Sequence, residues 1–302
     1  MPVENGVVHP LVSVIIRSMD RPTLSKALDS IAAQTYPNIE IIIVNAFGKN
    51  HSALSTECGN RPIRIVNNQE SLNRCQAANI GLHAASGDYL IFLDDDDWFL
   101  PHHLERLQQI LSCNEAAIAA YAGIQCINEF GEEISRYAEH FDLIQLRIEN
   151  FIPIHALLFK RKALDNGAHF DVALELCEDW DFWLQLAEMG DFKFVPEIGA
   201  VYRIQKGAGS GIRDNKVRTR QVMTAIYRKW ISRWGDDTLW SVLEYARYHK
   251  TAIASEQARL KLEQIIADRD HQIVALMNST SWRITRPMRA ISSLFKKILT
   301  SD

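Results

Sequence analysis

The sequence predicts an α/β protein built on a central sheet with helices on both faces, followed by a helical extension. Three observations lead to this prediction. From residue 11 to about 125, short apolar runs alternate with helical patterns, as in β-α-β units. The apolar runs are rich in Ile, Leu and Val and are bounded by turn residues, which is typical of buried strands. Beyond about residue 213 the pattern is entirely helical.

The first half of the chain contains four expected strands. They lie at residues 11–16, 39–44, 63–66 and 89–93. Thr23 is a suitable N-cap for a helix that ends before Pro37, and a second helix is expected over residues 74–85. This order predicts parallel strands with the helices as crossovers.

The second half has a more mixed pattern. A hairpin around Gly131 is expected, then a strand over 154–159 and a helix from Trp180 that ends at Gly190. Further elements are expected: strands at 192–195 and 198–204, and helices at about 214–234 and 236–278. The predicted domains are residues 1–212, a helical extension over 213–278 with a short coiled coil, and a tail over 279–302.

Four consecutive acids, Asp94 to Asp97, directly follow the strand at 89–93. A parallel strand delivers such residues to the sheet edge where α/β proteins bind ligands. Adjacent carboxylates repel one another, and a hard divalent cation such as Mg²⁺ or Mn²⁺ would relieve that repulsion. One or two of the acids could instead only cap the next helix. An EF-hand is excluded because Trp98 and Phe99 stand where a ligand and a glycine are needed.

Composition narrows the class of protein. The net charge of −4 does not suggest a nucleic-acid partner, and no apolar run approaches the ~20 residues of a membrane span. The five cysteines are scattered and odd in number, which favours reduced thiols in the cytoplasm over a disulfide frame or a zinc site. The N-terminus has no signal-peptide pattern.

An ordered set of segments resembles the family 2 glycosyltransferases of the GT-A fold, a Rossmann-like fold of nucleotide-diphospho-sugar transferases. The resemblance covers about residues 10–210 and rests on their order and spacing. The segments are Val12–Ile16, Ser30–Val44, Asn73–Gly81, Ala85–Asp97 and Glu178–Trp183.

This resemblance implies specific roles. Asp94, Asp95 and Asp96 match the family's DxD motif, in which the first acid approaches the ribose or donor sugar and the last binds the metal. Asp179, beside Glu178, matches the proposed general base, and a place at a helix start would keep it ionised. Without the other segments, helix capping would explain this pair equally well.

The chain also departs from the family pattern at the donor site. Asn45 stands where an acid usually contacts the nucleobase, and its amide suits uracil. Gln205 replaces a usual His and is a poor metal ligand. Ala78 replaces a usual Arg, and Arg74 is expected to supply that charge to the donor.

Three further features near the site have alternative interpretations. Arg203 is expected at the donor. Trp98, beside the acids, is expected to stack on a sugar ring, whereas Trp183 is expected in the core. The segment from Gly207 to Gly211 is expected to be a lid over the donor, or a plain linker.

The C-terminal part has two expected interactions. An apolar stripe along the long helix could pair two copies of the chain or pack on the catalytic domain. Residues 282–299 combine apolar side chains with five cations, which predicts binding to an anionic membrane surface, at the inner face of a bacterial plasma membrane, or a solvated terminus.

These observations predict an inverting, metal-dependent glycosyltransferase. It would move a sugar from a nucleoside-diphosphate donor, expected to be a UDP-sugar, to a glycan or lipid-linked glycan acceptor in bacterial surface-polysaccharide synthesis. A sugar nucleotidyltransferase is the main rival, although the Gly-rich loop of that class is missing after the first strand. The other rival is a glycan-binding or scaffold protein with a decayed site.

Overall fold

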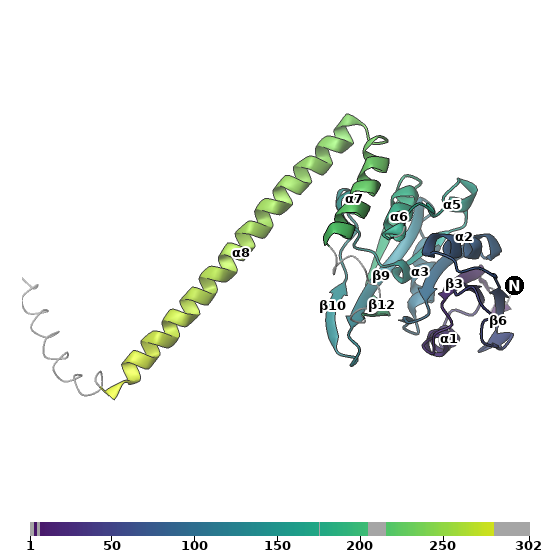
Figure 1. Cartoon of the computed structure of the whole chain (residues 1–302), viewed down its shortest axis with the longest axis horizontal. Coiled ribbons are helices and arrows are strands. Elements are labelled where there is room, and N and C mark those ends of the chain that lie inside the picture. The colour runs from purple at the N-terminus through teal and green to yellow at the C-terminus, as the bar shows by residue number, and fades with distance from the viewer. Residues whose placement is uncertain (1–2, 5–6, 175, 205–215, 281–302) are drawn as a thin grey trace, which may run out of the picture. The chain divides into compact units, whose positions relative to one another are not determined.

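The computed structural model describes residues 3–4, 7–174, 176–204 and 216–280 of the 302-residue chain (Figure 1). Its contacts divide the chain into two compact units, one ending at Val242 and the other starting at Leu243. The first unit contains the sheet, and each unit is described by itself below.

A mixed sheet of ten strands forms the centre of the first unit, in the order β5-β6-β4-β3-β7-β11-β9-β12-β8 with β10 beside β9. The strands β3, β4, β6 and β7 are parallel, as are β9 and β12, whereas β11 runs antiparallel to both β7 and β9. A separate pair, β1 and β2, lies near the N-terminus. The bounds are β1 Val3–Glu4, β2 Val7–Val8, β3 Val12–Ser18, β4 Ile39–Asn45, β5 Glu57–Cys58, β6 Arg61–Val66, β7 Tyr89–Asp94, β8 Trp98–Phe99, β9 Ala117–Ile127, β10 Glu133–Tyr137, β11 Leu157–Lys160 and β12 Asp191–Arg203.

Helices pack against this sheet, α2 on β3 and β4 and α3 on β9 and β12. Every residue of β3 is buried, so both faces of the sheet are covered at its centre. The helices are α1 Leu24–Ala32, α2 Arg74–Ala84, α3 His103–Ser112, α4 Leu143–Ile148, α5 Lys162–Asp165, α6 Glu178–Ala187, α7 Lys216–Ile231 and α8 Asp236–Asn278, with a 3₁₀ turn, η1, at Ile154–Ala156.

The structure confirms the predicted α/β class and the main elements, and three of the expected strands differ from the prediction. Residues 192–195 and 198–204 were expected to be separate strands, but they belong to the single strand β12. Its pairing with β9 shifts register between Val195 and Ile198. Pro196, which cannot donate to the ladder, lies in that interval and accounts for the interrupted pattern. The expected strand at 154–159 begins as the 3₁₀ turn η1 and becomes β11 only at Leu157.

Helix α2 is placed by two local features. Asn73 caps it: Asn73 Oδ1 accepts the Gln76 N–H at 2.8 Å, and Gln76 Oε1 accepts the Asn73 N–H at 2.9 Å. Gly81 faces the sheet, where a Cβ atom would lie 2.3 Å from a methyl group of Ile15. The helix therefore packs closely on β3, and its first residue, Arg74, is held at the carboxyl end of the sheet.

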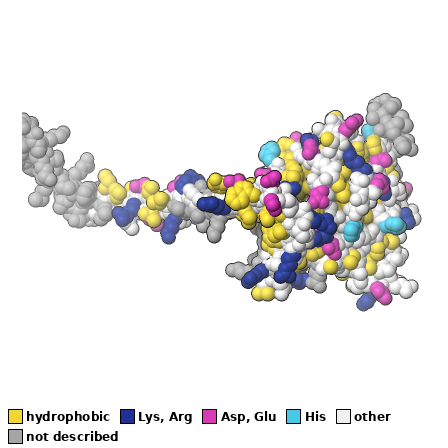
Figure 2. All heavy atoms as spheres, turned by 90° about the horizontal axis from the view of Figure 1, so that it is seen from above, with side chains coloured by type: hydrophobic (Ala, Val, Ile, Leu, Met, Phe, Trp, Pro, Cys, Tyr) yellow, Lys and Arg dark blue, Asp and Glu magenta, His cyan; other side chains and the backbone are white. Residues whose placement is uncertain are grey.

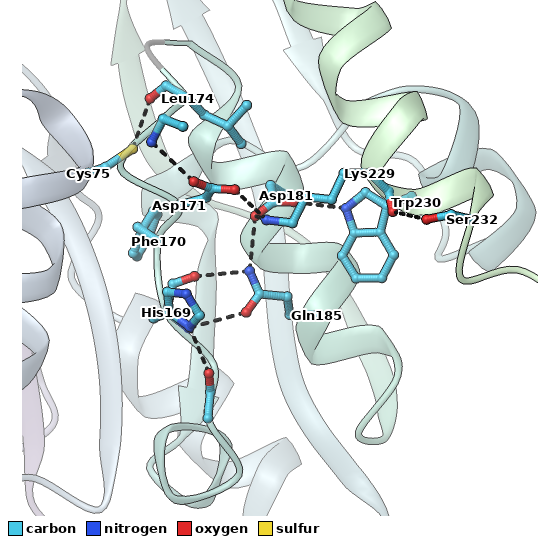
Figure 3. Close-up of polar contacts among 12 residues, drawn as sticks. Cys75, His169, Phe170, Asp171, Leu174, Asp181, Gln185, Lys229, Trp230 and Ser232 are labelled. Carbon is cyan, nitrogen blue, oxygen red and sulfur yellow. Dashed lines mark hydrogen bonds and ion pairs between the residues drawn. The ribbon is translucent and has the colours of Figure 1, made fainter.

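A buried polar network joins α6 to α7 (Figure 3). Asp181 of α6 is fully buried and accepts three hydrogen bonds, from Trp230 Nε1 at 2.8 Å, Lys229 Nζ at 2.9 Å and Gln185 Nε2 at 3.0 Å. Lys229 also pairs with Asp171 at 2.8 Å. These bonds hold α7 on the unit that contains the sheet, whose contacts extend to Val242.

The second unit contains most of the long helix α8. Its large apolar side chains are exposed along the helix, between basic and acidic ones (Figure 2). They include Leu260, Leu262, Ile265, Ile266, Ile273, Val274 and Met277. No helix in the described part of the chain is both long and apolar enough to span a membrane.

Candidate active site

A pocket of about 270 Å³ opens at the carboxyl ends of β3 and β7. The chain leaves β3 toward β4 on one side and returns to β7 on the other, so β3 marks the switch point of the parallel part of the sheet. Crevices at such points are where open α/β sheets bind ligands. The lining consists of Arg17, Met19, Arg21, Ala46, Leu72, Arg74, Ala77, Asp94, Asp95, Asp96, Tyr202 and Arg203.

Arg17, at the end of β3, connects two acids that lie far apart in the sequence. Its guanidinium donates to both oxygens of Asp94 at 2.8–3.0 Å and to Glu178 Oε1 at 2.8 Å. Burial, the largest single influence, raises the pKa of Asp94, but the charges of Arg17 and Arg74 and the hydrogen bond from Arg17 together outweigh burial, and the pKa lies below its ordinary value. Asp94 is therefore ionised and held in place beside the pocket.

Asp95 and Asp96 share a second arginine. Nη1 of Arg21 lies 2.9 Å from Asp95 Oδ1 and 2.9 Å from Asp96 Oδ2. The other oxygen of Asp95 accepts the Met19 N–H at 2.7 Å, and that side chain is only 1% exposed, whereas Asp96 is 22% exposed. Burial, and next the charge of Asp94, raise the pKa of Asp96. Arg21 therefore compensates the negative charge of Asp96 only in part.

Asp97, the fourth acid, points away from the pocket. Its Oδ1 accepts the Arg203 N–H at 2.8 Å, and its Oδ2 lies 3.3 Å from Nδ1 of the buried His155. Burial, followed by the charge of Asp96, raises the pKa of Asp97 well above its ordinary value. This acid holds the end of β12 against the acidic turn.

Asp179 lies in the first turn of α6, after Cys177 in a left-handed conformation with a φ of 55°. A non-glycine residue at positive φ is uncommon and often marks a functional site. Asp179 is half-buried, and no described cation lies within ion-pair distance of it. Burial, and next the charge of Glu178, raise the pKa of Asp179 to about 7. A carboxylate with that pKa can accept a proton near neutral pH.

Glu178 has a different role from its neighbour. It is 3% exposed, and its carboxylate is bonded to Arg17. Through that bond the first turn of α6, with Asp179, is tied to the pocket residues Arg17 and Asp94. Glu178 therefore positions the site, and Asp179 is the carboxylate of this pair that is able to act as a base.

Asn45 and Arg74 are placed differently from each other. Asn45 is 1% exposed and serves its own turn, with Nδ2 donating to Lys49 O at 2.6 Å and Oδ1 accepting the Phe47 N–H at 3.1 Å. The next residue, Ala46, lines the pocket instead. Arg74 lines it as well, is exposed, and forms no ion pair with any described residue.

A second hollow of about 350 Å³ shares Asp96 and Arg203 with the first. Trp98 lies in this hollow and not in the first pocket, with Lys26 Nζ 3.2 Å from the centre of its ring. Phe130, at the turn between β9 and β10, also lines it and is 79% exposed. Trp183 is fully buried, as expected, and its Nε1 donates to Ile152 O at 2.9 Å.

The acidic turn fits a divalent cation in a particular way. Among the described residues, no group of three or more His, Cys, Asp or Glu side chains is arranged to hold a metal by itself. Magnesium and manganese, however, are often held by one or two carboxylates, with substrate phosphates and water completing the shell. Asp96, partly exposed to the pocket and short of positive charge, fits that arrangement.

From the sequence, no role was assigned to Arg17 or Arg21, and Asp97 was included only as one of the four consecutive acids. An arginine inside the apolar run that forms β3 is itself a signal, since a charge in a buried strand needs a partner. Its partner Glu178, however, is 161 residues away. Gln205 and the segment Gly207–Gly211 lie outside the described residues.

Comparison with known proteins gives a consistent result. The family model described as "Glycosyl transferase family 2" matches residues 13–169. A relative from Bacillus subtilis, YwdF, described as an uncharacterized glycosyltransferase, is 26% identical over 226 residues, covering 72% of this chain and 83% of YwdF. An uncharacterized glycosyltransferase from Haemophilus influenzae is 27% identical over 188 residues, covering 60% of this chain and 64% of that protein.

Two solved structures share the fold. The mannosyltransferase PcManGT from Pyrobaculum calidifontis, in complex with GDP-Man and Mn²⁺, has a TM-score of 0.56 at 17% identity and covers 98% of this chain and 89% of its own. TarS from S. aureus, in complex with UDP-GlcNAc, has a TM-score of 0.55 at 16% identity and covers 72% of this chain and 65% of its own. These likenesses show the GT-A fold.

Proposed function

The chain belongs to glycosyl transferase family 2, and from this premise we propose that it transfers a sugar from a nucleoside-diphosphate sugar to a hydroxyl group of a glycan acceptor, with inversion. The observation that carries the proposal is the meeting of the acids of β7, several arginines and the first turn of α6 at one sheet edge. Family membership sets aside the nucleotidyltransferase alternative.

The donor would bind in the pocket of about 270 Å³. Arg74 and Arg203 line this pocket and would bind the diphosphate, since a guanidinium group can donate two hydrogen bonds to phosphate oxygens. Asp94, fixed by Arg17, would accept hydrogen bonds from ribose or sugar hydroxyls. Asp95 would hold the acidic turn in place, because its oxygens accept hydrogen bonds from the Met19 N–H and from Arg21.

Asp96 would hold a divalent cation, Mg²⁺ or Mn²⁺, together with the donor diphosphate. When bound, such an ion would stabilise the negative charge that develops on the diphosphate leaving group. The support from this chain is the chemistry of Asp96 itself, a partly exposed carboxylate whose pKa burial and Asp94 raise.

Asp179 would accept the proton of the attacking acceptor hydroxyl. Inversion follows if the hydroxyl displaces the diphosphate in one step, with a single base and no covalent intermediate. The pKa of Asp179, which burial and next the charge of Glu178 raise to about 7, supports this role. Glu178 and Arg17 would set the position of that base relative to the donor.

We propose UDP as the donor nucleotide. The amide of Asn45 is engaged within its own turn, so main-chain groups around Ala46 would read the base, with Asn45 holding their conformation. Both a UDP-sugar and a GDP-sugar are bound by structural neighbours, so both nucleotides belong in the test.

The second hollow offers room for a sugar ring beside the donor. Trp98 and Phe130 present aromatic surface, and aromatic rings with polar neighbours suit amphipathic ligands. The proposed acceptor is a polysaccharide or a lipid-linked glycan. We also propose that the tail binds the inner membrane face as a peripheral anchor, and that two copies of the chain pair through Leu262, Ile266 and Ile273 of α8. The tail lies outside the described residues.

A panel of nucleoside-diphosphate sugars tests the proposal. Wild-type protein with Mn²⁺ should hydrolyse or transfer at least one of them, and EDTA or Asp96→Ala should abolish that activity with the fold unchanged by circular dichroism. Asp268→Ala, an exposed acid on α8, is the matched control. Full activity of Asp96→Ala, or of wild type in EDTA, would refute the metal-dependent site.

A further inference from the structure

Arg21 forms an ion pair with Asp96, the carboxylate that is proposed to bind the metal. Its Nη1 lies midway between Asp95 Oδ1 and Asp96 Oδ2, 2.9 Å from each. It comes from the turn between β3 and α1, at a position that Asp20 braces. Asp20 has a φ of 57°, and its Oδ2 accepts the Ser52 N–H at 3.1 Å and the Ser52 hydroxyl at 2.8 Å. The contact is therefore built into the turn.

The two arginines of the acidic turn differ in how firmly they are held. The acids that pair with the two arginines are similarly buried, so the difference lies in the arginines: the side chain of Arg17 is 6% exposed and donates through three nitrogens to Asp94 and Glu178. The side chain of Arg21 is 44% exposed and contacts Asp95 and Asp96 through one nitrogen. An arginine that is half-exposed and held through one nitrogen can exchange its partner more easily than one that is buried and held through three.

We propose that Arg21 is a resident counter-cation of Asp96, which the divalent metal and the donor diphosphate displace together. This inference rests on the proposed function. A guanidinium and a divalent cation repel each other at contact distance, so both cannot neutralise the same carboxylate at low cost. A diphosphate offers Arg21 another anion inside the same pocket, which Arg21 already lines.

This exchange would couple the metal to the nucleotide. With the protein alone, the metal has to compete with Arg21 for Asp96. With a nucleoside diphosphate present, Arg21 gains a new partner, and the metal gains phosphate ligands. The affinity for metal should then be low in the free protein and rise when nucleotide binds, and the coupling must be reciprocal. Asp96 would thus keep Arg21 as a partner until a donor arrives.

Metal binding by the full-length protein tests this. The Kd for Mn²⁺ alone is measured by calorimetry or by the electron paramagnetic resonance of free Mn²⁺, for wild type and Arg21→Gln, without nucleotide and then with UDP or GDP. Arg21→Gln should bind Mn²⁺ alone tighter, by about tenfold or more. The increase in Mn²⁺ affinity that nucleotide produces should be smaller in the variant than in wild type.

Three control variants locate the effect. Arg21→Lys keeps a cation at the turn and should retain the weak Mn²⁺ binding of wild type. Arg106→Gln removes an exposed charge on α3 and should change nothing. In the double variant Arg21→Gln/Asp96→Ala the gain should vanish, which shows that the gained affinity belongs to Asp96.

The outcomes separate this inference from the proposed function. If Arg21→Gln binds Mn²⁺ alone no tighter than wild type, while Mn²⁺ still promotes UDP or GDP binding, the role of Arg21 is refuted and the metal-dependent donor site stands. If neither protein binds Mn²⁺ with or without either nucleotide, both are refuted.

Discussion

Asp179 and Asp181 lie two residues apart in the first turn of α6, yet their surroundings are opposite. Asp181 is fully buried and accepts hydrogen bonds from Trp230, Lys229 and Gln185 (Figure 3). Asp179 is half-buried beside another acid and has no described cation next to it. A buried acid that is fully hydrogen-bonded and paired contributes to holding elements of the fold together, and breaking its pairing is costly. A buried acid without an ion-pair partner is destabilised in its charged form. This raises its pKa, so that it can accept a proton near neutral pH.

The largest effect should come from Asp179→Asn, which removes the proposed base with little change in shape. The variant should bind nucleotide and Mn²⁺ as wild type does, but its kcat should fall by ~10² to 10⁴. A wild-type rate would show that the base lies elsewhere, and that Asp179 does not differ from Asp181 in function.

The same variant should also be more stable than wild type at alkaline pH. The pKa of Asp179 is raised to about 7 in the folded protein, from about 3.9 when unfolded. The folded state thus holds its proton more tightly, and this favourable contribution is lost as the pH rises from about 4 to 7. Asp179→Asn should accordingly raise the Tm at pH 8 and leave it unchanged at pH 4.

A smaller effect, of a different kind, is expected from Asp181→Asn. This matched substitution weakens the bond to Lys229 and forces an amide to face N–H donors, so the free energy of unfolding should fall by about 1.5–3 kcal/mol. Urea unfolding measures that loss. Below the unfolding transition the activity per folded molecule should stay near that of wild type, and unchanged stability would mean that the network contributes nothing to the docking of α7.

Much of the fold was accessible from the sequence because its strands are short Ile- and Val-rich runs between turn residues. The predicted and observed bounds differ by few residues for β4, β7 and α2, and they coincide for α8. The short strands β5 and β8 were missed, since two residues carry no periodicity. Their pairing depends on neighbours distant in the chain, such as β12 for β8.

The candidate site was predictable in its acids and less so in its arginines. Asp94 to Asp97 could be recognised in the sequence because four adjacent carboxylates repel one another and require compensating positive charge. The role of Arg17 appears only when β3 and α6 come together in space. For Asn45 the sequence suggests an interaction that the structure does not favour. Its amide suits a nucleobase, but both polar atoms of that amide bond within the turn that follows β4. The position in the sequence does not reveal these bonds.

Asp179 is proposed as the base because burial and the charge of Glu178 raise its pKa, and because no described residue forms an ion pair with it. The pH dependence of kcat for metal-dependent donor hydrolysis or transfer tests this directly. The rate should rise with pH and level off, with a midpoint near the pKa of about 7 that burial and Glu178 produce, because only the ionised carboxylate can take the proton. A rate that is flat from about pH 5 to 9, or a midpoint near the ordinary aspartate value of about 4, would contradict it.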